Sequence, residues 1–253
     1  SIAGAVVFGA AWAFIPAYLQ ATRGSHVVIT TIMFNFIAAS LMVFLLVDVI
    51  RDTSQMGPHT VALPKEQWFP SFKDFAGLFG IKIRYSPLNI SFLLAILASV
   101  FVWFLVWKTR WGYEMRAVGH NTQAAIYAGI SPYKNIIIAM CISGGLAGLL
   151  GVNEILGVHH KIVAGFPAGY GFTGIAVALM GRNHPIGIFP AAFLFGILYQ
   201  GGSEVTFDMP NITRYMFVAV QGVIILFSGA LENLFRPQIE SFFVNRLNIK
   251  ASA

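Results

Sequence analysis

Residues 87–107 read PLNISFLLAILASVFVWFLVW and contain no charged side chain. An α-helix rises about 1.5 Å per residue, so about 20 apolar residues are needed to cross the hydrocarbon core of a bilayer. We therefore predict that this stretch is a membrane-spanning helix. The Ser86-Pro87 pair at its start is typical of a helix N-terminus, with serine as the N-cap and proline in the first helical position.

The whole chain of 253 residues has the same apolar character. Hydrophobic residues make up 57% of it and charged residues only 10%, whereas a typical soluble domain carries about 25% charged residues. So few charges cannot cover the surface of a soluble domain of this size. The composition therefore excludes an ordinary soluble globule and a disordered chain, and the single cysteine, Cys141, excludes a disulfide scaffold.

Five further apolar stretches are candidates for membrane spans. They are Ser1–Leu19, Val27–Val47, Asn135–Val152, Pro185–Gln200 and Tyr215–Leu231. The shorter stretch Phe172–Gly181 is only about half a membrane thick, so it is either a short buried helix or part of the wall of a transport path. We expect an all-α, polytopic transmembrane helical bundle of about six long spans plus this half-helix, in one domain over residues 1–253. Because the chain starts apolar at Ser1, we expect further spans before it.

Lysine and arginine are enriched in the cytoplasmic loops of membrane proteins, and the net charge of +6 fits such loops. One assignment places nine of these cations inside: Arg23, Lys108, Arg110, Arg116, Lys134, Arg182, Arg236, Arg246 and Lys250. The other seven then lie outside: Arg51, Lys65, Lys73, Lys82, Arg84, Lys161 and Arg214. This assignment predicts an outer loop at residues 51–86, a cytoplasmic loop at residues 109–133 and a cytoplasmic tail at residues 232–253.

Aromatic residues in the outer loop recur with helical spacing. Trp68, Phe72, Phe75 and Phe79 follow one another at intervals of 4, 3 and 4 positions, which places them on one face of a helix. Such a stripe fits a helix that lies in the membrane interface, and it fits equally well a helix packed on the spans. In both cases the element would lie on the outer surface, where a soluble partner can dock.

The sequence lacks the motifs of the common catalytic sites. There is no GxxxxGK[ST] loop, so we expect no ATP binding of that kind and no cofactor. Glu154, His159 and His160 match no standard spacing of metal ligands, so we expect no metal site. The side chains of the chain form no recognised pair of nucleophile and base, and we therefore expect a protein that is not itself an enzyme.

The predicted spans contain almost no ionisable residues, which argues against an ion-coupled carrier and an ion channel. What remains is a set of neutral polar side chains that either line a path for a neutral, hydrogen-bonding solute or join helices to one another. They are Thr30, Thr31, Asn35, Ser40, Ser143, Asn153, Thr173, Gln200 and Gln221. Asn35 is the strongest candidate, because an asparagine in the middle of a span must hydrogen-bond to another helix or face a water-filled path.

The most informative stretch is the cytoplasmic loop, which reads TRWGYEMRAVGHNTQAAIYAGISPY over residues 109–133. Asn121 is a good N-cap for a short helix over Thr122–Ala128, and Gly129 can end that helix. Arg116 is well placed to pair with an acidic partner. A short rigid helix held between two spans can transmit force from a partner that grips it, although the same features fit a structured loop without a partner.

This loop resembles the coupling-loop signature of ABC-importer permeases in the branched-chain amino acid, ribose and nucleoside group. The matching residues are Gly112, Arg116, Ala117, Gly119, Asn121, Ala124, Ala125, Gly129 and Ile130. Residues 27–38, VVITTIMFNFIA, and residues 171–187, GFTGIAVALMGRNHPIG, resemble two further blocks of the nucleoside and simple-sugar permeases. His26 stands where that family often has glutamate.

The resemblance implies a permease subunit of an ATP-driven importer in a bacterial inner membrane, moving nucleosides or related simple sugars by alternating access. It implies three partners: a cytoplasmic ABC ATPase that docks on the loop, a second and different permease subunit, and a periplasmic or lipid-anchored solute-binding protein. It also implies that residues 109–133 are cytoplasmic. For the solute path we expect contributions from Thr31, Asn35, Asn153, Phe172 and Thr173. The alternatives are an ion-gradient-driven carrier and an intramembrane enzyme.

Overall fold

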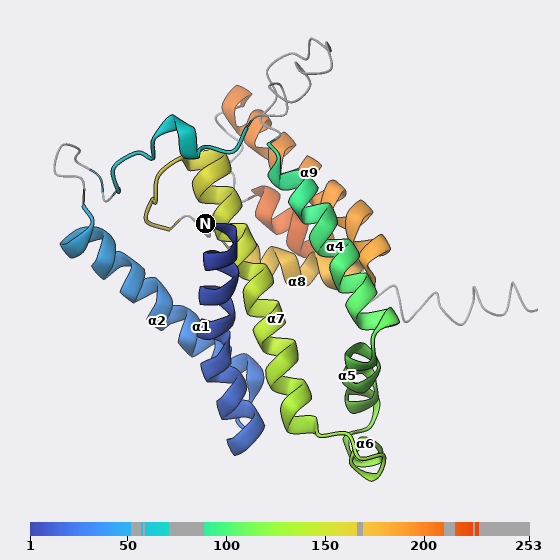
Figure 1. Ribbon diagram of the computed structural model, residues 1–253. Helices are drawn as coiled ribbons and strands as arrows, with labels where there is room; N and C mark the ends of the chain where they lie inside the picture. The colour runs from blue at the N-terminus through green and yellow to red at the C-terminus, as the bar shows by residue number, and fades with distance from the viewer. Residues whose placement is uncertain are drawn as a thin grey trace, which may run out of the picture. The chain divides into compact units, whose positions relative to one another are not determined.

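The computed structural model describes residues 1–51, 57, 59–70, 89–165, 169–209, 216–224, 226 and 227. Within these residues the chain is mostly helical, and extended backbone pairs at an isolated bridge between His59 and Val163. The chain divides into two compact units, Ser1–Ala168 and Gly169–Ala253 (Figure 1). In the described part, five helices are long and apolar enough to cross a membrane.

The first unit contains most of the long helices. Its elements are α1 (Ile2–Arg23), α2 (Val27–Phe44) with the π-helix η1 (Leu45–Val49), the 3₁₀-helix η2 (Lys65–Gln67), α4 (Ser91–Lys108), α5 (Arg110–His120), α6 (Thr122–Tyr127), and α7 (Pro132–Val152) with the π-helix η3 (Asn153–His159). The π-helical segments continue α2 and α7 without a break, so that each pair forms one apolar rod. Ser131 is the N-cap of α7 and Pro132 its first residue, as the sequence predicts.

The described part of the second unit contains a helical hairpin of α8 (Tyr170–Met180) and α9 (Pro185–Asp208), followed by a helical segment at residues 216–224. Arg182 and Asn183 in the turn adopt left-handed backbone conformations, with φ of 56° and 54°. The small core between the helices is formed by Ala176, Val177, Ala191 and Phe195. The short apolar helix predicted at residues 172–181 is confirmed, and it begins two residues earlier, at Tyr170.

Several boundaries differ from those expected. The predicted start at Ser86-Pro87 lies outside the described residues, and α4 begins at Ser91, whose backbone N–H donates to Asn89 Oδ1 at 3.1 Å. The helix predicted to end at Val152 continues through η3 to His159, and α9 runs on to Asp208 instead of ending at Gln200. The last predicted span, Tyr215–Leu231, lies partly outside the described residues, which are helical over 216–224.

The described part of the outer loop, residues 59–70, lies along η3. The backbone N–H of Phe69 donates to the carbonyl oxygen of Leu156 at 3.0 Å, and that of Leu63 donates to His160 at 2.8 Å. Trp68 follows η2 in extended backbone, and its ring stacks on His160 with centroids 3.7 Å apart. The prediction that Trp68 lies on a helical aromatic stripe is therefore wrong, and Phe72, Phe75 and Phe79 lie outside the described residues.

Close packing of α1 against α7 organises the first unit (Figure 1). Gly144 and Gly148 in α7 lie so near α1 that an added Cβ would run into the carbonyl oxygens of Gly9 and Ala5, respectively. Small residues at such spacing allow helices in a membrane to approach backbone to backbone. Later residues of α1 meet earlier residues of α7, so the two helices are antiparallel.

In this antiparallel arrangement the lysine and arginine side chains of the first unit lie in two groups, one at each end. Those assigned inside lie near the end of α1, the start of α7 and the α5–α6 segment: Arg23, Lys108, Arg110, Arg116 and Lys134. Those assigned outside lie at the η3 end: Arg51, Lys65 and Lys161. The cations assigned inside and those assigned outside thus lie at opposite ends of the first unit.

The packing of α1 on α7 gives a stability prediction. Gly148→Ala should lower the free energy of unfolding by about 1–3 kcal/mol, because its methyl group would overlap the Ala5 carbonyl. Gly151→Ala on the same helix is the control, because a Cβ there has no neighbour within 4 Å. It should be neutral or stabilising by up to about 1 kcal/mol through helix propensity. Unfolding of the purified full-length protein in mixed micelles measures both, and equal effects would contradict the packing argument.

Candidate functional site

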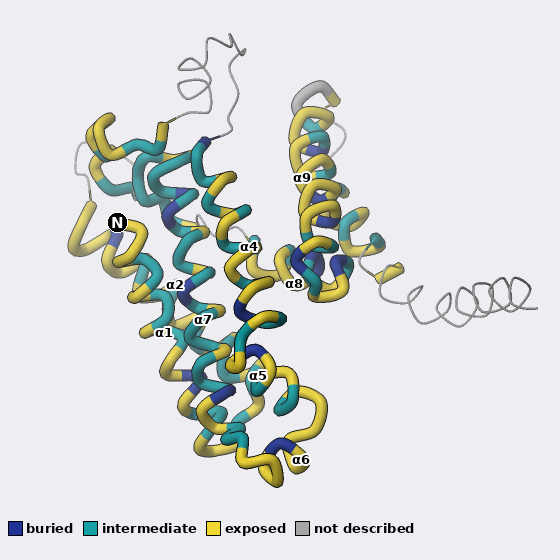
Figure 2. The backbone as a smooth tube through the Cα atoms, turned by 45° about the vertical axis from the view of Figure 1, so that its right-hand side comes forward, coloured by how far each residue is buried: buried dark blue, intermediate teal, exposed yellow. Residues whose placement is uncertain are grey.

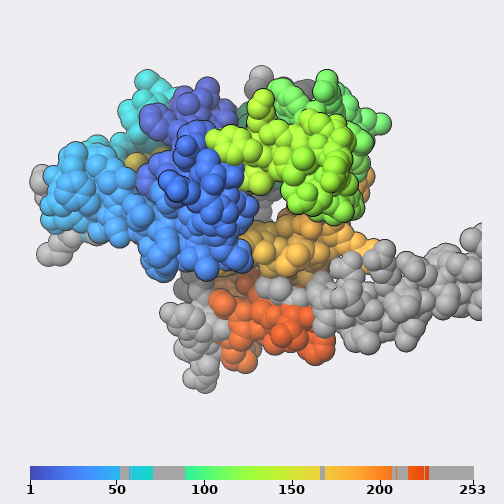
Figure 3. Space-filling model, turned by 90° about the horizontal axis from the view of Figure 1, so that it is seen from below, coloured from blue at the N-terminus to red at the C-terminus, as the bar shows by residue number. Residues whose placement is uncertain are grey.

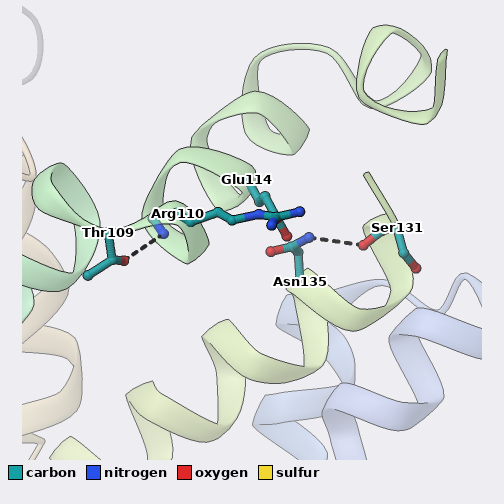
Figure 4. A network of polar contacts seen from close by, with 6 residues as sticks. Thr109, Arg110, Glu114, Ser131 and Asn135 are labelled. Atoms are coloured by element: carbon teal, nitrogen blue, oxygen red, sulfur yellow. Dashed lines mark hydrogen bonds and ion pairs between the residues drawn. The ribbon is translucent and has the colours of Figure 1, made fainter. Parts of the chain in front are cut away.

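The corner between α4 and α5 is built around the hydroxyl of Thr109. This hydroxyl donates to the carbonyl oxygen of Leu105 at 2.6 Å and accepts from the backbone N–H of Gly112 at 3.1 Å (Figure 4). One side chain therefore closes the end of α4 and caps the start of α5. The predicted cytoplasmic loop thus contains, besides the short helix expected after Asn121, the helix α5 over residues 110–120.

Two signals in the sequence point to α5. Thr109 is a favourable N-cap residue, and Arg110 and Glu114 stand four positions apart, which is the spacing of a helical ion pair. In the structure the Arg110 Nε lies 3.0 Å from the Glu114 Oε1. Figure 4 shows this pair beside Asn135 of α7, which is buried and donates from Nδ2 to the carbonyl oxygen of Ser131 at 3.0 Å. The start of α5 is therefore fixed against both neighbouring spans.

Gly112 is a glycine for steric reasons. It is buried, and an added Cβ would overlap the carbonyl oxygens of both Leu105 and Val106. Only a residue without a side chain allows α5 to fold back so closely on the end of α4. The first glycine of the loop pattern therefore serves the geometry of the corner.

The short helix α6 forms as the cap chemistry predicts, and it ends one residue earlier than expected, at Tyr127. Asn121 Oδ1 accepts from the backbone N–H groups of Gln123 and Ala124 at 3.0 and 3.1 Å. Gly129 has a φ of 77°, which a residue with a side chain rarely adopts. This turn lets the N–H of Ile130 reach back to the carbonyl oxygen of Ala125 at 2.9 Å, so α6 is closed at both ends.

The residues of the predicted coupling loop divide into two groups. Gly112 and Ala125 are buried and shape the loop, and Ala117 is half-buried. The exposed members are Arg116, Gly119, Asn121, Ala124 and Gly129. Figures 2 and 3 show that the α6 end of the unit is largely uncovered. Tyr127, which the sequence reasoning missed, is 92% exposed and projects from α6.

The expected path residues lie on several elements of the two units. Thr31 donates its hydroxyl hydrogen to carbonyl oxygens of its own helix, and Asn35 is exposed and forms no hydrogen bond within the described residues. Phe172 and Thr173 lie on α8 in the second unit. Asn153, at the start of η3, belongs to a connected group of polar side chains at the C-terminal end of α7.

We call this group the η3 cluster, and its members are Asn89, Ser91, Asn153, Glu154 and His159. Asn153 lies against the Ser91 hydroxyl through Oδ1 and donates from Nδ2 to Glu154 Oε1 at 3.3 Å. Glu154 is only 7% exposed and lies within the apolar rod Pro132–His159. The expectation that the spans carry almost no ionisable groups is therefore wrong at this position. In the described part of the chain, no three or more His, Cys, Asp and Glu side chains gather as metal ligands.

Comparison with known proteins places these features in context. The family model described as branched-chain amino acid transport system, permease component, matches residues 1–229. The guanosine ABC transporter permease protein NupP of Bacillus subtilis is 37% identical over 226 residues, which cover 88% of this chain and 62% of NupP. The nucleoside ABC transporter permease protein NupB of Lactococcus lactis is 36% identical over 227 residues, 85% of this chain and 59% of NupB.

A third relative is archaeal. The glucose ABC transporter permease protein TsgB13 of Haloferax volcanii is 32% identical over 249 residues, 96% of this chain and 64% of TsgB13. The chain thus spans between 59% and 64% of the length of these relatives. No solved structure matches the chain.

The α4–α5 corner gives the second prediction. Gly112→Ala should push α5 away from α4 and speed amide hydrogen exchange over residues 110–120 by about tenfold or more, because overpacking costs about 1–3 kcal/mol. Gly119→Ala in the same helix is the control, since a Cβ there meets no atom within 4 Å. Hydrogen exchange of the full-length protein, read by mass spectrometry, tests both, and unchanged exchange in Gly112→Ala would contradict the steric role.

Proposed function

The chain belongs to the family of branched-chain amino acid transport system permease components, and from this premise we propose that it is the permease subunit of an ATP-driven importer. The membership confirms the resemblance predicted from the three sequence blocks. The solutes we propose are nucleosides or related simple sugars, because the relatives NupP, NupB and TsgB13 are named for guanosine, nucleosides and glucose. Family membership favours this reading over an ion-gradient-driven carrier or an intramembrane enzyme.

The chain is a multi-pass membrane protein, as its five long apolar helices and its family indicate. We place it in the inner, or plasma, membrane of a bacterium. In this orientation the α5–α6 end faces the cytoplasm, since five of the cations assigned inside gather there. The η3 end then faces outward, toward a periplasmic or lipid-anchored solute-binding protein.

The observation that carries the proposal is the construction of α6. This helix is capped at both ends, exposed on its surface, and joined through α5 and Ser131 to the ends of α4 and α7. A partner that moves α6 therefore moves two spans together. We propose that the ABC ATPase docks here, with Arg116 pairing with an acidic group and Ala124 and Tyr127 forming the apolar contact.

Solute transfer then follows by alternating access, without covalent chemistry in this chain. ATP is bound and hydrolysed by the partner, and the permease uses no cofactor of its own. We propose that a second, different permease subunit covers the exposed face of α2, where Thr31 and Asn35 stand four positions apart on one side of the helix. The exposed amide of Asn35 would then face the solute path or the partner subunit instead of lipid.

The docking proposal predicts the effect of reversing one charge. Arg116→Glu should leave the protein folded, because Arg116 is exposed, but should lower recovery of the ATPase in affinity purification by at least about tenfold. Solute-stimulated ATP hydrolysis should fall in parallel. Arg51→Glu is the control, because this exposed arginine lies at the opposite end of the unit. Normal ATPase recovery and transport by Arg116→Glu would contradict the docking assignment.

A further inference from the structure

The η3 cluster lies near the outer edge of the membrane. The helix Pro132–His159 has 28 residues, which corresponds to about 42 Å of helix and exceeds the hydrocarbon thickness of about 30 Å. Glu154 stands roughly 33 Å along this rod from Pro132. It is thus remote from the α5–α6 end and close to the surface from which an imported solute would enter.

Two features of this segment mark it as more than a structural end of α7. Burial of a carboxylate is costly unless it is paired, and buried ionisable residues of membrane proteins commonly lie on solute pathways. Glu154 is nevertheless buried there. In addition, the backbone changes from α to π geometry at Asn153, and π-helical turns inside helices recur at functional sites.

Hydrogen bonds connect the members of the cluster, and one of them is donated to the carboxylate of Glu154. Asn89 Oδ1 accepts from the Ser91 backbone N–H, and the Ser91 hydroxyl lies against the side-chain oxygens of both Asn89 and Asn153. A hydroxyl has one hydrogen, so it can donate to only one of these oxygens at a time. Asn153 in turn donates to Glu154 Oε1. Among the described residues, Glu154 Oε2 faces His159 Nε2 at 3.6 Å, which is too long for a good hydrogen bond.

The cluster therefore has more acceptors than donors. An ionised carboxylate offers about four acceptor positions, and within the described residues Glu154 accepts one hydrogen bond, a long one of 3.3 Å from Asn153. A ligand that fits this imbalance supplies donors. Two adjacent hydroxyl groups on a sugar ring suit it best, because they can donate to the two oxygens of one carboxylate and still accept from neighbouring amides.

The cluster also has an open side. His159 keeps 41% of its side chain exposed, and Asn153 and Ser91 are partly exposed. The outer loop holds η3 from another side through Phe69, Leu63 and the Trp68–His160 stack. Glu154 is thus held in a fixed position and can be approached past His159.

We propose that the η3 cluster is a recognition site for a vicinal diol, such as the ribose 2′,3′-hydroxyls of a nucleoside, at the outer end of the solute path. Glu154 accepts hydrogen bonds from the two hydroxyls, and Asn153 and Ser91 complete the contact. The incoming hydroxyls take the place of the contact between Ser91 and Asn153. The inference rests on the proposed function. It adds to that function the chemical group of the solute that the permease itself recognises.

Transport by the reconstituted importer tests the inference. The full-length permease, with its ATPase, second permease and binding protein, is placed in liposomes, and turnover is measured at saturating loaded binding protein. Guanosine and 2′,3′-dideoxyguanosine are the two probes, because they differ only in the diol. Saturation removes the preference of the binding protein, so the turnover ratio of the probes reports on the permease.

We expect wild type to move guanosine faster, and Glu154→Gln to lower guanosine turnover by about tenfold or more while leaving dideoxyguanosine nearly unchanged. Glu154→Asp, which keeps the carboxylate, should partly restore the ratio. Ser91→Ala should lower the ratio of guanosine to dideoxyguanosine turnover, as Glu154→Gln does, with less risk to folding. Glu66→Gln is the control, since Glu66 is an exposed acid in the outer loop, and it should leave the ratio at the wild-type value.

Two results would overturn the inference while the proposed function stands. One is equal turnover of both probes by wild type. The other is a wild-type ratio retained in Glu154→Gln and Ser91→Ala, even if both rates fall, because a structural role lowers the two rates together. Absence of ATP-dependent uptake of any nucleoside or sugar by wild type would instead remove the proposed function, and the inference with it.

Discussion

Backbone contact between α1 and α7 holds the first unit in its arrangement. Between helices in a bilayer the hydrophobic effect gives little net attraction, so association depends on close van der Waals packing. Gly9, Gly144 and Gly148 supply it by letting carbonyl oxygens of one helix approach the other without an intervening side chain. Because this contact is antiparallel and rigid, the α5–α6 segment at one end and the η3 cluster at the other are parts of one connected body.

The presence of the spans could be predicted because the thickness of the bilayer imposes a minimum length on any apolar helix. Their ends could not be read from hydropathy alone. Glu154 and His159 interrupt the apolar run, and a charged residue suggests that a span has ended. In the structure these two side chains face each other, Asn153 supports the carboxylate, and the helix continues for seven residues as η3. Tertiary contacts thus overrode the local pattern.

In the coupling loop, too, features set by local chemistry could be predicted and features set by tertiary contacts could not. Asn121 and Gly129 were correctly identified, because caps and left-handed turns depend on local chemistry. The helix α5 was missed although Thr109 and the Arg110–Glu114 spacing favour it, because Gly112 and Gly119 within it lower the helix propensity. The need for glycine at residue 112 arises from the carbonyl oxygens of α4, and this contact is invisible without the fold. Trp68 was misplaced for a similar reason, because its partner His160 is far away in the sequence.

The α1–α7 contact also has a consequence for how the protein is made. Gly9 and Gly144 are far apart in the chain, and at about 5–20 residues per second a ribosome needs roughly 7–27 s to travel from one to the other. During that interval α1 is already synthesised while its partner does not yet exist. Its glycine-bearing face must therefore have other neighbours until α7 is made. Assembly of this unit is thus a delayed docking of helices that enter the membrane separately, and α1 completes its packing only after α7 has been synthesised.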